Sequence, residues 1–151
     1  MQLWDTPGQE RFQSLSSAYY RGANACVLLY DTTSRHSFDA LGKWRDDFLD
    51  SLLSALVVDP ERNFPFLVLG TKSDLEGSVA AEDVQEWCAY FGDGKTPWFE
   101  TSAKDNTNVE MAFIELAKKV RWRLAEPVQA VAFLPPMSHT RAAAKISSTC
   151  N

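Results

Sequence analysis

Short apolar segments of the strand type alternate along the chain with longer segments of helical period. The apolar segments cover residues 2–5, 25–31, 66–70 and 98–101. Each is bounded by polar, glycine or proline residues, as strands in a buried sheet usually are. Strands that alternate with helices are typical of β-α units, which build a parallel sheet. The sequence therefore predicts an α/β fold with a mostly parallel sheet.

Three segments between and after these strands place apolar residues at the spacing of one helix face. The first face is Leu41, Trp44, Phe48 and Leu52, the second is Val84, Trp87, Cys88 and Phe91, and the third is Val109, Ala112, Phe113, Leu116, Ala117 and Val120. This spacing predicts amphipathic helices. The third follows Thr107 and Glu110, the spacing of a capping box. The apolar stretch 51–59 is interpreted either as an extension of the first helix or as a cover over a groove.

The helical pattern ends near Glu126, and the rest of the chain is rich in proline and small polar residues. The sequence predicts one domain over residues 1–124 and a flexible tail over 125–151. No apolar stretch approaches the roughly 18 residues of a spanning helix, and residues 1–20 lack the pattern of a signal peptide. We therefore expect a cytoplasmic protein.

Composition narrows the class of protein further. The chain has 151 residues, 45% of them hydrophobic, and a formal net charge of −5. This content supports a packed core, and the negative charge argues against nucleic acid as a partner. The three cysteines, Cys26, Cys88 and Cys150, and the two histidines form no cluster with metal-ligand spacing. We expect Cys26 and Cys88 to be buried free thiols.

Each of the four predicted strands ends in polar residues. They are Asp5, Thr6 and Gly8 at the end of the first, Asp31, Thr32 and Thr33 at the end of the second, Thr71, Lys72 and Asp74 at the end of the third, and Thr101 and Ser102 at the end of the fourth. Ligands of open parallel sheets bind at the carboxyl ends of the strands. Each ending is unremarkable alone, but together the four endings predict a ligand site at this edge.

The segment 4–12, Trp-Asp-Thr-Pro-Gly-Gln-Glu-Arg-Phe, resembles the second switch of small GTPases, and in particular its Rab form. The resemblance implies that Asp5 holds Mg²⁺ through water and that the Gly8 backbone approaches the terminal phosphate. It also implies that Gln9 is catalytic and orients the water that attacks the γ-phosphate. Pro7 stands where Rab proteins usually have alanine, and its fixed φ stiffens this loop.

Two further segments resemble the guanine-binding loops of the same family. Thr71-Lys72-Ser73-Asp74 is similar to the motif Asn-Lys-x-Asp, and residues 100–104 are similar to the last base-binding loop. A carboxylate accepts two parallel N–H bonds from guanine, a donor pair that adenine lacks. The nucleotide-binding residues implied by the resemblance are Asp5, Gly8, Thr71, Lys72, Asp74, Ser102, Ala103 and Lys104.

Residues 19–23 and 30–33 resemble Rab proteins in general, and residues 44–49, 63–66 and 108–110 are most similar to vacuolar and late-endosomal Rab proteins. The resemblance implies a molecular switch that hydrolyses GTP in endosome-to-vacuole traffic, with GTP or GDP and Mg²⁺ as cofactors. It implies effectors and regulators as partners, and peripheral attachment to a late-endosome or vacuole membrane. Rab proteins usually end in two prenylated cysteines. Cys150 is the one candidate here, whereas stable anchoring usually takes two signals.

The resemblance runs from Met1 to about residue 122, and no phosphate loop or first switch precedes Met1 in this sequence. The expected fold is thus an incomplete P-loop GTPase fold of three layers, with helices on both faces of the sheet. For this chain we expect weak or no nucleotide binding, since the base-reading half is present without the phosphate-reading half. Two alternatives stay open, a catalytically inactive Rab-like interaction fragment and a partial gene model.

Overall fold

The computed structural model describes residues 2–4, 6, 20, 23–54, 64–91, 96–123 and 132–134. Within these residues four strands and four helices are present. In chain order they are β1 (Cys26–Asp31), α2 (Arg35–Asp39), α3 (Leu41–Ser54), β2 (Phe66–Thr71), α4 (Ala81–Phe91), β3 (Trp98–Glu100), α5 (Val109–Arg123) and β4 (Ala132–Leu134). The alternation of strands and helices confirms the α/β class.

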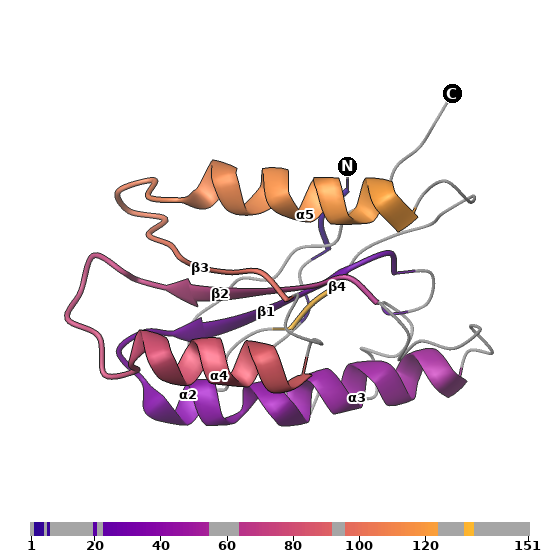
Figure 1. The fold of residues 1–151 in the computed structure, drawn as a ribbon, viewed down its shortest axis with the longest axis horizontal. Coiled ribbons are helices and arrows are strands. Elements are labelled where there is room, and N and C mark those ends of the chain that lie inside the picture. Colours follow the sequence, from indigo (N-terminus) through magenta and orange to yellow (C-terminus); the bar gives the residue numbers. More distant parts are fainter. Residues whose placement is uncertain are drawn as a thin grey trace.

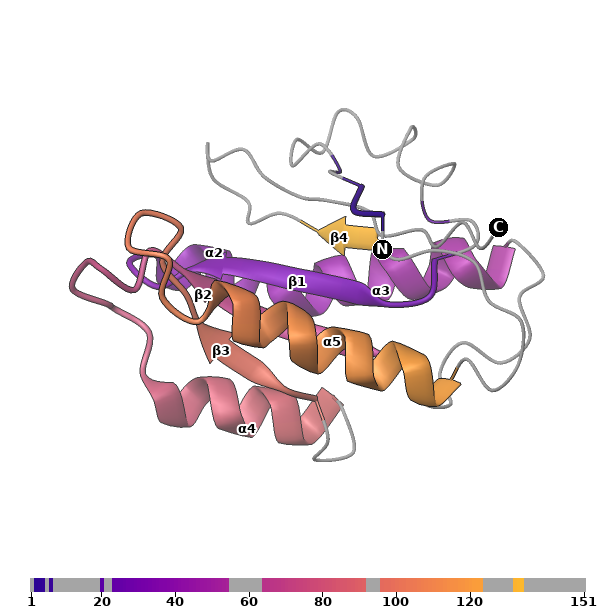
Figure 2. The ribbon, with the colours of Figure 1, turned by 90° about the horizontal axis from the view of Figure 1, so that it is seen from above.

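The four strands form one parallel sheet in the order β3-β2-β1-β4. β1 and β2 pair along their whole length, from Cys26 opposite Phe66 to Asp31 opposite Thr71. Figure 2 shows the sheet from above, with β4 and β3 at its two edges. Because the strands are parallel, their last residues, Asp31, Thr71 and Glu100, lie along the same side of the sheet, which we call its carboxyl edge. The loops that follow these residues lie close together.

Helices cover both faces of the sheet, as Figure 1 shows: α5 lies on one side and α2, α3 and α4 lie on the other. The strands β1 and β2 are buried on both faces, which explains why their sequences are nearly continuous apolar runs. One apolar cluster fills the space under α2, α3 and α4, and a smaller cluster, which includes Ala112 and Leu116, packs between the sheet and α5. These layers confirm the expected three-layer arrangement.

The first predicted strand is not observed in the described residues. Residues 2–4 have no strand conformation, and Asp5 lies outside the described part of the chain. The side of β1 that faces away from β2 pairs with β4 instead, with Cys26 opposite Ala132. β4 lies in the segment 125–151, for which the sequence predicts a flexible tail, and no strand was predicted at these positions.

The predicted helices are confirmed, with one correction at a helix start. α5 begins at Val109, and Asn108 before it has a φ of 57°. Because this left-handed residue separates Thr107 from the helix, Thr107 does not occupy the N-cap position, and the predicted capping box is wrong. The amide of Thr107 donates to the Ser102 carbonyl at 3.0 Å instead. α3 continues to Ser54, so the first part of the stretch 51–59 extends that helix; the rest lies outside the described residues.

Candidate functional site at the carboxyl edge of the sheet

The end of β2 and the loop that follows it carry three of the site residues predicted from the sequence, Thr71, Lys72 and Asp74. The Thr71 hydroxyl donates to the Tyr30 carbonyl at 2.9 Å, which ties the ends of β1 and β2 together. Lys72 leaves the strand with a φ of 64°, a left-handed conformation that is uncommon outside glycine and turns the chain sharply. The amide of Leu75 then donates to the Lys72 carbonyl at 2.9 Å and closes a turn around Asp74.

The loop that follows β3 lies directly against this turn. The amide of Thr101 donates to the Gly70 carbonyl at 2.6 Å, and the amide of Ser73 donates to the Thr101 carbonyl at 3.1 Å. Both bonds extend the pairing of β2 and β3 beyond the strands themselves. They hold Ser102 and the residues after it beside Asp74.

Asp74 is the point where the two loops meet. The Ser102 hydroxyl donates to one carboxylate oxygen of Asp74 at 2.7 Å, and the Lys104 ammonium donates to the other at 3.3 Å. The Asp74 side chain is only 10% exposed, whereas that of Lys104 is 73% exposed. The hydrogen bond from Ser102, supported by the one from Lys104, lowers the pKa of Asp74 against the effect of burial. Asp74 is therefore an ionised acceptor at neutral pH.

The hydrogen-bonding groups around this turn, an acceptor carboxylate and a backbone N–H donor, are complementary to the edge of a guanine base. Each oxygen of the Asp74 carboxylate accepts one hydrogen bond, and each has a further lone pair. Ala103 is exposed in the turn after Ser102, and within the described residues its amide donates to no acceptor. A ligand that presents two N–H groups to Asp74 and a carbonyl to Ala103 would match these groups.

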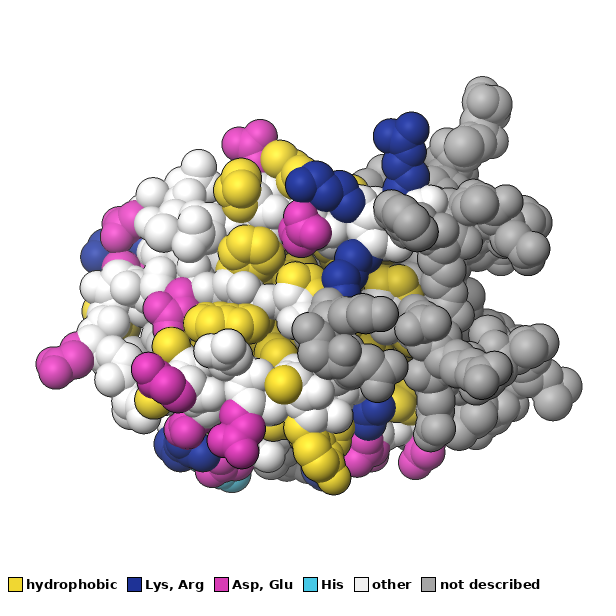
Figure 3. Space-filling model, in the orientation of Figure 1, with side chains coloured by type: hydrophobic (Ala, Val, Ile, Leu, Met, Phe, Trp, Pro, Cys, Tyr) yellow, Lys and Arg dark blue, Asp and Glu magenta, His cyan; other side chains and the backbone are white. Residues whose placement is uncertain are grey.

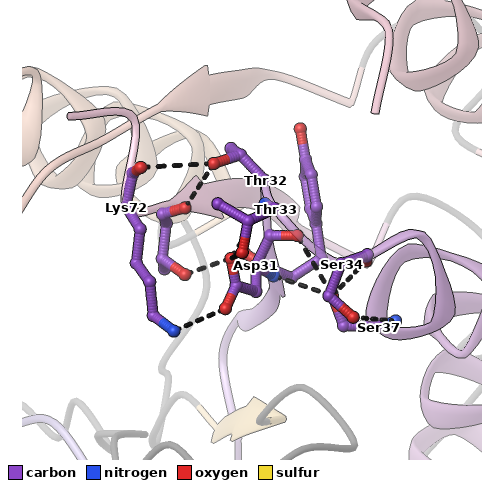
Figure 4. Close-up of polar contacts among 8 residues, drawn as sticks. Asp31, Thr32, Thr33, Ser34, Ser37 and Lys72 are labelled. Atoms are coloured by element: carbon purple, nitrogen blue, oxygen red, sulfur yellow. Dashed lines mark hydrogen bonds and ion pairs between the residues drawn. The ribbon is translucent and has the colours of Figure 1, made fainter. Parts of the chain in front are cut away.

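A second carboxylate, Asp31, stands at the end of β1 and contacts the same loop. The Lys72 ammonium lies 2.5 Å from one oxygen of Asp31, and the amide and hydroxyl of Thr33 donate to the other (Figure 4). Burial raises the pKa of Asp31, but the hydrogen bonds from Lys72 and Thr33 outweigh burial and hold it below its ordinary value. Sequence analysis placed Asp31 at this edge but assigned it no contact with the predicted site.

The structure thus brings together Thr71, Lys72, Asp74, Ser102, Ala103 and Lys104 at one end of the sheet, at the left of Figure 1. Asp5, Gly8 and Gln9, the predicted metal, phosphate and catalytic residues, lie outside the described residues, as does Cys150. In the described ranges, no three His, Cys, Asp or Glu side chains are grouped so that they could hold a metal ion. The roles assigned to these four residues therefore stay predictions.

Three other findings concern the described part of the chain. No helix in it is both long and apolar enough to cross a membrane. Figure 3 shows hydrophobic side chains at the surface between α5 and α4, over the edge strand β3, whose Trp98 and Phe99 are half-buried. Cys26 and Cys88 are free and buried, as the sequence predicts.

The fold and the site define an open parallel α/β protein. Its candidate ligand-binding loops follow the consecutive strands β1, β2 and β3. Comparison with known sequences then gives the family: the Ras family matches residues 1–122, and this chain belongs to it. The chain is 52% identical over 122 residues to the Ras-related protein Rab7 of Pisum sativum, an alignment that covers 78% of this chain and 56% of the relative.

Two further relatives are similar to the same extent. The Ras-related protein Rab7 of Drosophila melanogaster is 53% identical over 119 residues, which is 78% of this chain and 55% of the relative. The GTP-binding protein YPTC5 of Chlamydomonas reinhardtii is 52% identical over 117 residues, which is 75% of this chain and 54% of the relative. The chain thus spans about half the length of the curated relatives that it matches.

Proposed function

We propose that this chain functions as a Rab-type small GTPase that binds guanine nucleotide at the loops after β2 and β3. The observation that carries the proposal is the pairing of Asp74 with Ser102 and Lys104, which joins the two loops into one acceptor site. The family membership supports it, as does the printed name of one relative, a GTP-binding protein. Asp74 would accept the N1–H and the 2-amino group of guanine, and the Ala103 amide would donate to its carbonyl.

The remaining parts of the proposal come from the sequence resemblance. Asp5 would hold Mg²⁺ through water, Gly8 would approach the γ-phosphate, and Gln9 would orient the attacking water for hydrolysis of GTP to GDP and phosphate. The proposed cellular role is a switch in late-endosome or vacuole traffic, with Rab effectors and regulators as partners. Membrane association would be peripheral, with Cys150 as the candidate lipidation site.

The base-reading part is tested by changing the hydrogen-bonding groups of Asp74. Asp74→Asn replaces one acceptor by a donor, so the variant should prefer xanthosine diphosphate, which has a carbonyl where guanine has its 2-amino group. The loss of a bond to a charged acceptor predicts about a tenfold or greater fall in GDP affinity. Dissociation constants for both nucleotides are measured by chemical-shift titration of the 151-residue chain, a method that also reports weak binding.

The control is Asp105→Asn, the same chemical change at an exposed position of the neighbouring turn. It should leave the preference for GDP over xanthosine diphosphate and over ADP unchanged. A wild-type chain that binds GDP and ADP equally would contradict the proposal. So would an Asp74→Asn variant whose ratio of the two affinities equals that of the wild type.

A further inference from the structure

We propose that Asp31 is a positioning residue for the guanine-binding loop, which it holds by anchoring the ammonium group of Lys72. The inference rests on the proposed function, because it concerns the same loop. It adds a residue from β1, one of the two inner strands, to a site otherwise built from the loops after β2 and β3.

The Asp31 carboxylate is fully engaged and almost fully buried. Its side chain is 6% exposed, and the Lys72 ammonium lies 2.5 Å from its Oδ2 atom. The Oδ1 atom accepts hydrogen bonds from the amide of Thr33 at 2.9 Å and from its hydroxyl at 2.7 Å. With both oxygens held, the carboxylate is a fixed point to which a flexible lysine can be tied.

The strand end that carries Asp31 is itself held in place. The amide of Asp31 donates to the Ser37 hydroxyl at 2.9 Å, and that hydroxyl donates to the Ser34 carbonyl at 2.8 Å (Figure 4). Ser34 also caps the short helix α2. The anchor for Lys72 is thus part of a bonded turn rather than a freely rotating surface carboxylate.

The backbone around Lys72 needs such an anchor. The residue is held at a φ of 64°, which for a side chain with a Cβ persists only where surrounding contacts impose it. The Thr32 hydroxyl donates to the carbonyls of Thr71 at 2.9 Å and Lys72 at 3.3 Å, so the backbone and the side-chain end of Lys72 are both tied to the turn after β1.

This arrangement leaves the stem of Lys72 as the part that is free to contact a ligand. The side chain is 36% exposed although its ammonium group is paired. A stem fixed at both ends forms a flat apolar surface beside Asp74, two residues further on. Without the Asp31 carboxylate the stem would swing away and the loop would lose one of its constraints, so that base binding would weaken.

The test compares four chains of 151 residues: the wild type, Asp31→Asn, Lys72→Met and the double variant. Asn keeps the size of Asp31 and can still accept from Thr33, while Met keeps the apolar stem of Lys72. We expect each single change to lower the affinity for GDP and for free guanosine by about tenfold, the cost of one charged hydrogen bond. In the Lys72→Met background, Asp31→Asn should change the affinity by less than about twofold, because the two residues act as one pair.

Asp39→Asn is the matched control, because Asp39 also forms an ion pair, with Arg35. That pair lies on the exposed surface of α2. It should leave both affinities unchanged. Additive effects in the double variant would overturn the inference, since they would mean that Asp31 acts on the fold and not through Lys72. A loss confined to GDP, with guanosine binding unchanged, would also overturn it.

Two observations separate this inference from the proposed function. A wild-type chain without guanine preference rejects the proposed function, whereas a wild type that binds guanine and an Asp31→Asn variant that binds equally well reject the inference alone. If Asp31→Asn fails to fold, the ion pair is tested in the wild type instead. NMR then measures how fast the lysine ammonium protons exchange with water. The Lys72 ammonium should exchange more slowly with water than that of Lys43, which is exposed, and equal exchange would overturn the inference.

Discussion

Two aspartates at the carboxyl edge of the sheet are ionised for different reasons. Asp74 is held ionised mainly by the Ser102 hydroxyl, a partner from the next loop along the sheet. Asp31 is held ionised against its own burial by Lys72 and Thr33. The difference suits their proposed roles, since Asp74 can exchange a weak partner such as Lys104 for a ligand, whereas Asp31 is fixed in the protein.

Gly70 is the residue that allows β2 to pass close to Tyr30. A Cβ built on Gly70 would lie 2.7 Å from the Tyr30 hydroxyl oxygen and 2.8 Å from its Cζ atom. Tyr30 is completely buried and packs edge-on against Phe38 at 5.3 Å, so its ring has little room to move. Gly70→Ala should therefore destabilise the chain by about 1–3 kcal/mol, the usual cost of overpacking.

Urea denaturation measures this change in the free energy of unfolding. Gly42→Ala is the control, because a Cβ at Gly42 meets nothing within 4 Å and the residue lies inside α3. Alanine favours a helix over glycine by roughly 1 kcal/mol, so this variant should be as stable as the wild type or more stable. Equal free energies for both variants would show that Tyr30 and Gly70 do not pack as described.

At the scale of elements, α3 is attached to the sheet by a group of aromatic rings centred on Phe48. Its ring lies 5.1 Å from that of Tyr20, 5.2 Å from that of Phe64 and 5.9 Å from that of Phe66, measured between centroids. Phe48 is completely buried. Because the surrounding side chains of a packed core relax only partly into such a cavity, Phe48→Ala should cost about 3–5 kcal/mol of stability.

Tyr90→Ala provides the comparison for this aromatic deletion. Tyr90 is 81% exposed on α4, so its removal should change the free energy of unfolding by less than about 0.5 kcal/mol. Both variants are measured by urea denaturation, with the slope m compared to confirm that the same surface is exposed on unfolding. A loss below about 1 kcal/mol for Phe48→Ala would be inconsistent with its place in the core.

The elements that sequence predicted well are those whose pattern is set by burial. β1 and β2 are buried on both faces and α5 on one, and the apolar pattern gave both strands to within one residue and the presence of the helix. The errors fall where long-range pairing or backbone geometry decides. β4 forms because it pairs with β1, and the start of α5 depends on the left-handed Asn108.

The same distinction applies to the candidate site. Sequence motifs placed Thr71, Lys72 and Asp74 after β2, and parallel strands explain why Ser102 and Lys104 come beside them. The contact of Asp31 with Lys72 was not predicted, because it joins two residues 41 positions apart and depends on the left-handed backbone conformation of Lys72. Its one sequence signal was a charged residue at the end of a fully apolar strand.

At the scale of the whole molecule, the titrating groups confine maximal stability to a middle range of pH. The pKa values of Asp31 and Asp74 are lower in the folded chain than their ordinary values. Their contribution to stability is therefore present above about pH 4, the pKa of an unfolded aspartate, and is lost as the pH falls through the folded pKa. The pKa values of Cys26 and Cys88 are shifted in the other direction, because burial raises the pKa of the Cys26 thiol and raises that of the Cys88 thiol to about 12.

Since the folded pKa values of the thiols lie above those of unfolded cysteine, their contribution is complete below about pH 8.5 and decreases as the pH rises beyond it. Urea midpoints measured from pH 3 to pH 11 should therefore form a plateau between roughly pH 4 and pH 8.5 that falls on both sides.

Two variants test which groups cause the two declines. Asp31→Asn should reduce the loss of stability at acid pH, and Cys88→Ala should reduce the loss at alkaline pH, each without affecting the other. An acid limb identical in Asp31→Asn and the wild type would show that folding does not change the pKa of Asp31, and the anchoring of Lys72 would lose its basis.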